Sequence, residues 1–135
     1  HTANRRQRQM CIRDRINGDN YKTRDGTPIR DYIHVSDLAE AHLLSLKYLL
    51  NGNKSGIFNC GYGKGYSVRE IIQTANKLFN NTINFSIGPK RPGDSKYVVA
   101  NPNKFIKTMK WRPKFNNIKK IIISAVNWEK KLRVI

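Results

Sequence analysis

Three glycines in the run "CGYGKGYS" are the residues whose type and spacing first suggest chemistry. Gly61, Gly63 and Gly65 stand between an apolar segment and an amphipathic one, where glycines can cradle the phosphates of a dinucleotide. Their spacing departs from the G-x-G-x-x-G fingerprint, because Tyr66 occupies the position of the third glycine. The acidic residue expected about 20 residues further on is also missing. We therefore predict a structural turn, with a cofactor site as the less favoured alternative.

A basic run, "RRQRQMCIRDR", occupies Arg5 to Arg15 in a chain whose formal net charge is +17. Back-translated codon by codon, this run resembles the transposase adapter that is used to build sequencing libraries. We interpret residues 1–15 as a sequencing-adapter artefact and expect them to be disordered. A genuine disordered basic arm is the alternative. With the first interpretation Cys11 is foreign, and Cys60 is the only native thiol.

The remaining charge is mostly lysine, and it is scattered rather than gathered into a stripe. No known DNA- or RNA-binding motif occurs, so a basic nucleic-acid-binding protein is the less favoured class of function. No apolar stretch approaches the roughly 20 residues that span a bilayer, and no signal-peptide pattern is present. The two cysteines lack the spacing of a metal site. We expect a cytoplasmic protein with no nucleic-acid, membrane or metal partner.

From Asn17 onward, strand-like and helix-like segments alternate as in a layered α/β fold. Asp25-Gly26 lies between extended runs and predicts a hairpin turn. Residues 36–50 predict a helix that is capped by Ser36 or Asp37 and largely buried, since its apolar residues occur nearly all round.

The second half of the chain predicts three more strands and three more helices. Ser67 and Glu70 have the spacing of a capping box, which predicts that a helix begins there. Trp111 and Trp128 are interpreted as packing anchors. The predicted strands are 55–61, 83–88 and 96–101, and the predicted helices are 67–79, a short one from Asn101-Pro102, and 118–132.

Four stretches carry a resemblance to a known family. They are "RDGTPIRDYIHVSDLAEAH", "FNCGYGKGYSVREII", "KRPGDSKYVVANPNK" and "MKWRPKFNNIKKIIISAVNWE". Together they resemble the C-terminal part of the UDP-glucose 4-epimerase branch of the extended short-chain dehydrogenase/reductase family. The resemblance covers residues 18–132. It implies the C-terminal part of a Rossmann-type α/β fold, mainly the smaller substrate-binding domain and incomplete, with residues 16–135 as the UDP-sugar-binding region.

The activity that this resemblance implies is the interconversion of UDP-glucose and UDP-galactose by transient oxidation at carbon 4. Its cofactor would be NAD, held by an N-terminal part that carries the glycine fingerprint and the Tyr-x-x-x-Lys pair. No tyrosine of this chain has a lysine four residues later, so we expect no catalytic residue here and no activity from the chain alone. The resemblance also implies a homodimer. Another nucleotide-sugar epimerase or dehydratase of the same family is the alternative.

The resemblance further assigns substrate-binding residues. Arg30 and Arg91 match the family's diphosphate ligands, and guanidinium forks suit a diphosphate. Asp94 matches the carboxylate that accepts ribose hydroxyls, and the Pro-Gly bend places it on one loop with Arg91. Tyr32 would line the pocket, with a packed strand aromatic as an equal alternative. His34 is predicted to be a hydrogen-bonded structural residue.

Overall fold

The computed structural model describes residues 15–80 and 83–132 as two compact units. Within these residues, unit 1 comprises 15–30 and 66–98, and unit 2 comprises 31–65 and 99–132. The prediction that residues 1–15 are a disordered artefact falls outside the described residues, except for Arg15, which begins the first strand.

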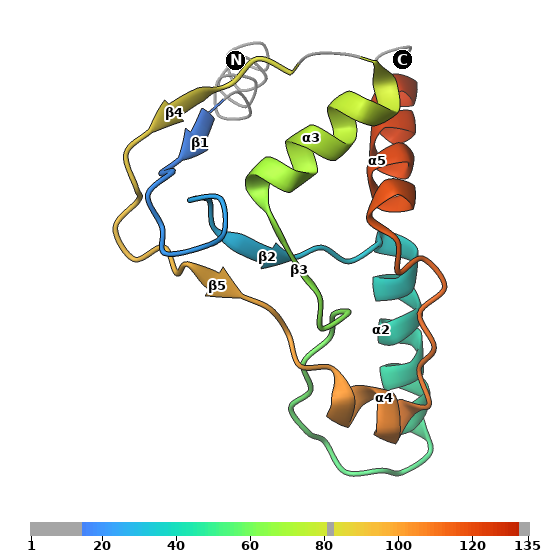
Figure 1. Cartoon of the computed structure of the whole chain (residues 1–135). Helices are drawn as coiled ribbons and strands as arrows, with labels where there is room; N and C mark the ends of the chain where they lie inside the picture. The colour runs from blue at the N-terminus through green and yellow to red at the C-terminus, as the bar shows by residue number, and fades with distance from the viewer. Residues whose placement is uncertain (1–14, 81–82, 133–135) are drawn as a thin grey trace, which may run out of the picture. The chain divides into compact units, whose positions relative to one another are not determined.

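The helices and strands follow one another in mixed order (Figure 1). The described elements are β1 (Arg15–Asn17), β2 (Ile29–Asp31), α2 (Val35–Leu50), β3 (Gly65–Ser67), α3 (Val68–Phe79), β4 (Ser86–Gly88), β5 (Tyr97–Val98), α4 (Asn103–Met109) and α5 (Ile118–Leu132). Among the described residues, none of the helices is both long and apolar enough to cross a membrane.

The strands pair over long distances in the sequence. β1 runs parallel to β4, with Ile16 opposite Ile87, and β2 runs parallel to β5, with Ile29 opposite Tyr97. β3 lies on the other side of β2. The predicted hairpin at Asp25-Gly26 is therefore wrong, because β1 and β2 belong to different sheets. The turn itself is present, with Gly26 at φ +80°, but it links two strands that each pair with a distant segment.

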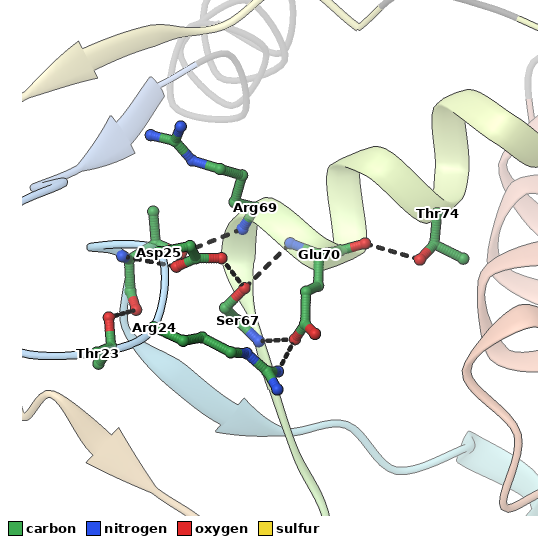
Figure 2. Close-up of polar contacts among 8 residues, drawn as sticks. Thr23, Arg24, Asp25, Ser67, Arg69, Glu70 and Thr74 are labelled. Carbon is green, nitrogen blue, oxygen red and sulfur yellow. Dashed lines mark hydrogen bonds and ion pairs between the residues drawn. The ribbon is translucent and has the colours of Figure 1, made fainter.

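The start of α3 is held by a polar network that joins it to this turn (Figure 2). The predicted capping box is confirmed: the Ser67 hydroxyl accepts from the amide of Glu70, and the Glu70 carboxylate accepts from the amide of Ser67. The Ser67 hydroxyl also donates to Asp25, and Arg24 forms an ion pair with Glu70. The network thus fixes the turn against the first turn of α3.

Asp25 is the centre of that network in unit 1. Its carboxylate accepts from the amide of Thr27 at 2.9 Å and from the Thr27 hydroxyl at 2.7 Å. Burial alone would raise the pKa of Asp25, but these bonds, the one from Ser67 and the nearby charge of Arg69 together lower it below its ordinary value. The carboxylate is therefore an ionised acceptor that organises the turn.

Unit 2 has a small aromatic core. Trp111 is 1% exposed and packs edge-on against Phe105, with ring centroids 5.5 Å apart. Ala41 of α2 and Met109 of α4 complete the buried cluster. Trp111 is thus confirmed as a packing anchor. Trp128 is not, because it is 59% exposed on α5.

The prediction that the helix over 36–50 is largely buried is wrong. In α2 only Asp37 and Ala41 are buried, while Leu46 is 53% and Leu50 77% exposed. An apolar sequence indicates that its side chains favour burial. It does not indicate which other segment of the protein packs over them. The cap also differs from the prediction, because His34, not Ser36 or Asp37, is the N-cap residue.

The predicted strand over 55–61 is also wrong. The structure has no strand among residues 51–64, and Ile57 is 87% exposed. A short apolar run becomes a strand only where a neighbouring strand offers its backbone groups. The predictions for 83–88 and 96–101 are confirmed in shorter form, as β4 and β5.

Candidate functional site

The segment that carries Arg91 and Asp94 is tied to residues 17–21 in unit 1. The amide of Gly18 donates to the carbonyl of Gly88 at 2.8 Å, extending the pairing of β1 with β4. Lys90 Nζ donates to the Asn20 carbonyl at 2.8 Å and lies 4.4 Å from the ring centroid of Tyr21. These contacts hold the start of the predicted binding loop in place.

Arg91 lies in the next position and is exposed. With the Asn17 amide turned so that its oxygen faces Arg91, that oxygen accepts from Nε at 3.2 Å and from Nη2 at 2.9 Å. The chain then bends: the amide of Asp94 donates to the Arg91 carbonyl at 3.2 Å, and Gly93 has φ +83°. This positive φ favours glycine. Arg91 and Asp94 therefore share one tight turn, in agreement with the spacing argument.

Arg30 lies on β2, in the same unit. Its side chain is half-buried, and Nη1 donates to the Ile29 carbonyl at 2.9 Å. The partner of Arg30 across the parallel ladder is Val98, and the amide of Ile29 donates to the carbonyl of Lys96 at 2.9 Å. The strand of Arg30 is thus joined to the residues that directly follow the Arg91–Asp94 turn.

Tyr32 lies just beyond β2, which ends at Asp31, and it belongs to unit 2. Its pocket-lining role stays a prediction. His34 is confirmed as a structural residue. It is buried, its Nδ1 accepts from the amide of Ser36 at 3.1 Å, and its ring stacks on Phe115 at 4.3 Å.

A second polar cluster lies in unit 2 around Asp37, which is 1% exposed. The Tyr62 hydroxyl donates to it at 2.5 Å, and the amides of Lys114 and Phe115 donate at 2.9 Å each. Burial would raise the pKa of Asp37, but these three bonds and the nearby His34 lower it below its ordinary value. Burial and the bond to Asp37 raise the pKa of Tyr62. The pair is therefore a carboxylate and a neutral phenol.

The backbone of the glycine run, residues 61–63, lies against the carboxylate of Asp31. Asp31 accepts from the amides of Tyr62 and Gly63, at 3.2 and 3.3 Å from Oδ2. A Cβ at Gly61 would meet the same oxygen at 2.4 Å. Glycine is needed here because the Asp31 side chain comes so close to the backbone. These contacts are those of a structural turn.

Cys60 precedes this turn and is half-buried. Burial, together with the charges of Asp31 and Asp37, raises the pKa of its thiol, which makes it a weak nucleophile at neutral pH. The part of the chain that the structure describes contains no group of three or more His, Cys, Asp or Glu side chains placed to hold a metal ion.

The contacts that Asn17, Asp37 and Tyr62 form were not predicted from the sequence. An asparagine at the end of a short strand carries no sequence signal of a contact with Arg91. Asp37 did carry one, because an acidic residue in the first turn of an apolar helix needs donors when it is buried.

Comparison with known proteins finds similarity to one family of enzymes. A model of the NAD dependent epimerase/dehydratase family matches residues 4–61. The chain is also 47% identical, over 113 residues, to the UDP-glucose 4-epimerase of Lacticaseibacillus casei, an alignment that covers 84% of this chain and 34% of that relative. Over residues 4–61 the chain is thus similar to the NAD dependent epimerase/dehydratase family, and over most of its length it is similar to UDP-glucose 4-epimerases. The resemblance noted in the sequence is thereby confirmed.

Solved structures of this epimerase family share the fold. A crystal structure of a UDP-glucose 4-epimerase has a TM-score of 0.81 and 44% identity, covering 87% of this chain and 36% of that one. The Bifidobacterium longum UDP-glucose 4-epimerase, solved in complex with NAD+ and UDP, has a TM-score of 0.78 and 38% identity, covering 87% and 34%. The predicted α/β fold class is confirmed. The chain spans about a third of the length of the curated relatives it matches.

Proposed function

We propose that this chain is the UDP-sugar-binding region of a UDP-glucose 4-epimerase, with Arg30, Arg91 and Asp94 as ligands of the UDP. The observation that carries the proposal is the pairing of β2 with β5, which joins the strand of Arg30 to the residues that follow the Arg91–Asp94 turn. The identity of 47% to a UDP-glucose 4-epimerase supports the choice of substrate.

The physical reason lies in what a 4-epimerase must do. The hexose has to turn over in the site, so binding energy must be concentrated on the nucleotide, whose diphosphate is dianionic. Charge-assisted bonds from guanidinium groups are the strongest that side chains offer to phosphate oxygens. Arg91 is exposed beside a tight turn, and the Asp94 carboxylate on that turn suits ribose hydroxyls. Tyr32 is proposed as a pocket-lining residue.

The described residues do not fit the NAD that this family uses. The amides of Tyr62 and Gly63 in the glycine run already donate to Asp31, so they are not free to receive a pyrophosphate. We propose that a part of the enzyme outside this chain binds NAD, which supplies the hydride chemistry when bound. We also propose that the enzyme is a cytoplasmic homodimer. The low cysteine content of the chain, two residues in all, fits a reducing compartment.

A chimera tests this function. Residues 16–135 would replace the matching segment of the Lacticaseibacillus casei UDP-glucose 4-epimerase, and conversion of UDP-galactose to UDP-glucose would be followed. We expect epimerisation by the chimera and none by the 135-residue chain alone. Arg30→Ala and Arg91→Ala should raise KM more than they lower kcat, because these contacts hold the nucleotide in ground state and transition state alike.

Two results would decide against the proposal. A folded chimera that binds NAD but converts neither UDP-hexose would contradict the assignment of this chain to a 4-epimerase. If the chimera acts only on another nucleotide sugar, that sugar would be assigned as the substrate in place of UDP-glucose. The result would favour a different member of the family.

A further inference from the structure

Two neighbouring basic residues, Lys90 and Arg91, have different surroundings in unit 1. Lys90 is committed to the protein, since its ammonium group donates to the Asn20 carbonyl and lies over the Tyr21 ring. Arg91 is exposed, and the side-chain contact described for it is with Asn17. The loop therefore presents one cation that anchors it and one that faces outward.

The Asn17 contact uses a particular edge of the guanidinium. A single oxygen accepts from Nε and from Nη2, at 3.2 and 2.9 Å. Within residues 15–80 and 83–132, this leaves the second N–H of Nη2 and the N–H groups of Nη1 as the donors of Arg91 without a described partner. These donors form the end-on fork, the edge that a phosphate can engage with two parallel bonds.

Asn17 is also neutral. It can fix the plane of the guanidinium without cancelling the positive charge, whereas a carboxylate at the same place would form an ion pair and compete with an anionic ligand. The backbone around Asn17 is tightly constrained. It is the last residue of β1, and the next residue, Gly18, has φ +86° and no room for a Cβ, which would lie 2.5 Å from Lys90 Cγ.

We infer that Asn17 is a positioning residue for the UDP site: it orients Arg91 so that the end-on fork of the guanidinium faces the diphosphate at full charge. This inference rests on the proposed function. It makes residues 17–21, which the resemblance did not single out as ligands, the support of the diphosphate clamp. Asn17 orders the guanidinium, and Gly18, Asn20 and Tyr21 order the backbone that carries it.

The first test needs no ligand. In NMR spectra of the chimera described above, the Nε–Hε resonance of Arg91 reports on the bond to Asn17. We expect Asn17→Leu, which keeps the volume and removes the acceptor, to shift this resonance and speed its exchange with water. Asn20→Ala is the matched control, because it alters the same loop but keeps the carbonyl that binds Lys90. An Arg91 resonance unchanged by Asn17→Leu would overturn the inference.

The second test is calorimetry with UDP on the same variants of the chimera. Asn17→Leu should weaken UDP binding about 3- to 10-fold, and by no more than about twofold when Arg91 is already alanine, because Asn17 acts through Arg91. Asn17→Asp should also weaken binding, although it keeps an acceptor, because the new charge competes with the phosphates. A purely structural role for Asn17 predicts instead that Asn17→Asp binds UDP normally.

The outcomes separate the two proposals. If Arg91→Ala weakens UDP binding and Asn17→Leu does not, the positioning role is overturned while the proposed function stands. If the chimera with the unaltered segment shows no UDP binding, the proposed function fails, and with it a role for Asn17 in positioning a UDP ligand. The Nε resonance then decides only whether the pairing with Arg91 exists. Equal losses from Asn17→Leu with and without Arg91 would also contradict the inference.

Discussion

The Asp37 cluster of unit 2 and the Arg91 loop of unit 1 both place a charged side chain among hydrogen-bond partners, with opposite results. Asp37 is buried and accepts from one hydroxyl and two amides. Arg91 is exposed and has one amide oxygen on one edge of its guanidinium. The first charge is satisfied by the protein, and the second retains donors for a ligand.

This contrast distinguishes a structural residue from a proposed binding residue by how much of its hydrogen-bonding capacity the described part of the protein uses. Removing a charge whose partners are buried leaves those partners unsatisfied, which costs folding free energy. Removing an exposed charge changes the folding free energy little, but it weakens the binding of any ligand that the charge contacts. The two sites should therefore respond differently to the same kind of substitution.

The largest effect is expected at Asp37. Asp37→Ala should lower the free energy of unfolding by about 2 to 4 kcal/mol, because the hydroxyl of Tyr62 and the amides of Lys114 and Phe115 lose their acceptor. Urea unfolding followed by tryptophan fluorescence, to which Trp111 and Trp128 both contribute, measures it. The control is Glu40→Ala, whose exposed ion pair with Lys114 should contribute less than about 1 kcal/mol. Equal effects of the two substitutions would contradict the structural role of Asp37.

A smaller loss is expected at the start of α3 in unit 1. Ser67→Ala removes the N-cap hydroxyl, which accepts from Glu70 and donates to Asp25. It should cost about 1 to 2 kcal/mol of stability, measured by urea unfolding followed by far-ultraviolet circular dichroism. Thr74→Ala, in the middle of the same helix, should change stability by less than about 0.5 kcal/mol. If Ser67→Ala were as mild as Thr74→Ala, the network in Figure 2 would not stabilise the helix.

The smallest effect is a dependence of stability on pH. Because the pKa of Asp37 is lower in the folded chain than its ordinary value of 3.8, the unfolded chain takes up this proton first as the pH falls. The stabilisation by ionised Asp37 is therefore complete above about pH 5 and is lost as the pH falls below about 4, through the folded pKa. Asp37→Asn should flatten this part of the stability curve, because it removes the titrating group. An acid limb of the same slope in both proteins would assign the effect to other carboxylates, Asp25 among them.

Local signals in the sequence predicted local structure well. The capping box at Ser67 and Glu70 placed the start of α3, and the Arg91–Asp94 spacing predicted their shared turn. These features depend on residues that are close together in the sequence. The interactions that form them can therefore be predicted from the local sequence.

Features that depend on distant partners were predicted poorly. Asp25-Gly26 has the chemistry of a hairpin, but the strands beside it pair in parallel with β4 and β5. The apolar residues of α2 and the exposed Trp128 show that apolar character alone does not determine burial. Asn17 could not have been found, because its contact with Arg91 arises only when β1 pairs with β4.

Calorimetry with UDP on the whole enzyme, here the chimera, paired with urea unfolding, on Arg91→Ala and Arg30→Ala is the most direct test of the proposed site. Each substitution should weaken UDP binding by roughly 10- to 150-fold, the equivalent of losing one charge-assisted contact of about 1.5 to 3 kcal/mol. Asp94→Asn should weaken it less, because the amide oxygen still accepts from a ribose hydroxyl. Stability of the exposed-site variant Arg91→Ala should change by less than about 0.5 kcal/mol. Unchanged affinity in both arginine variants, with folding intact, would contradict the site and return Arg30 and Arg91 to the class of ordinary surface charges.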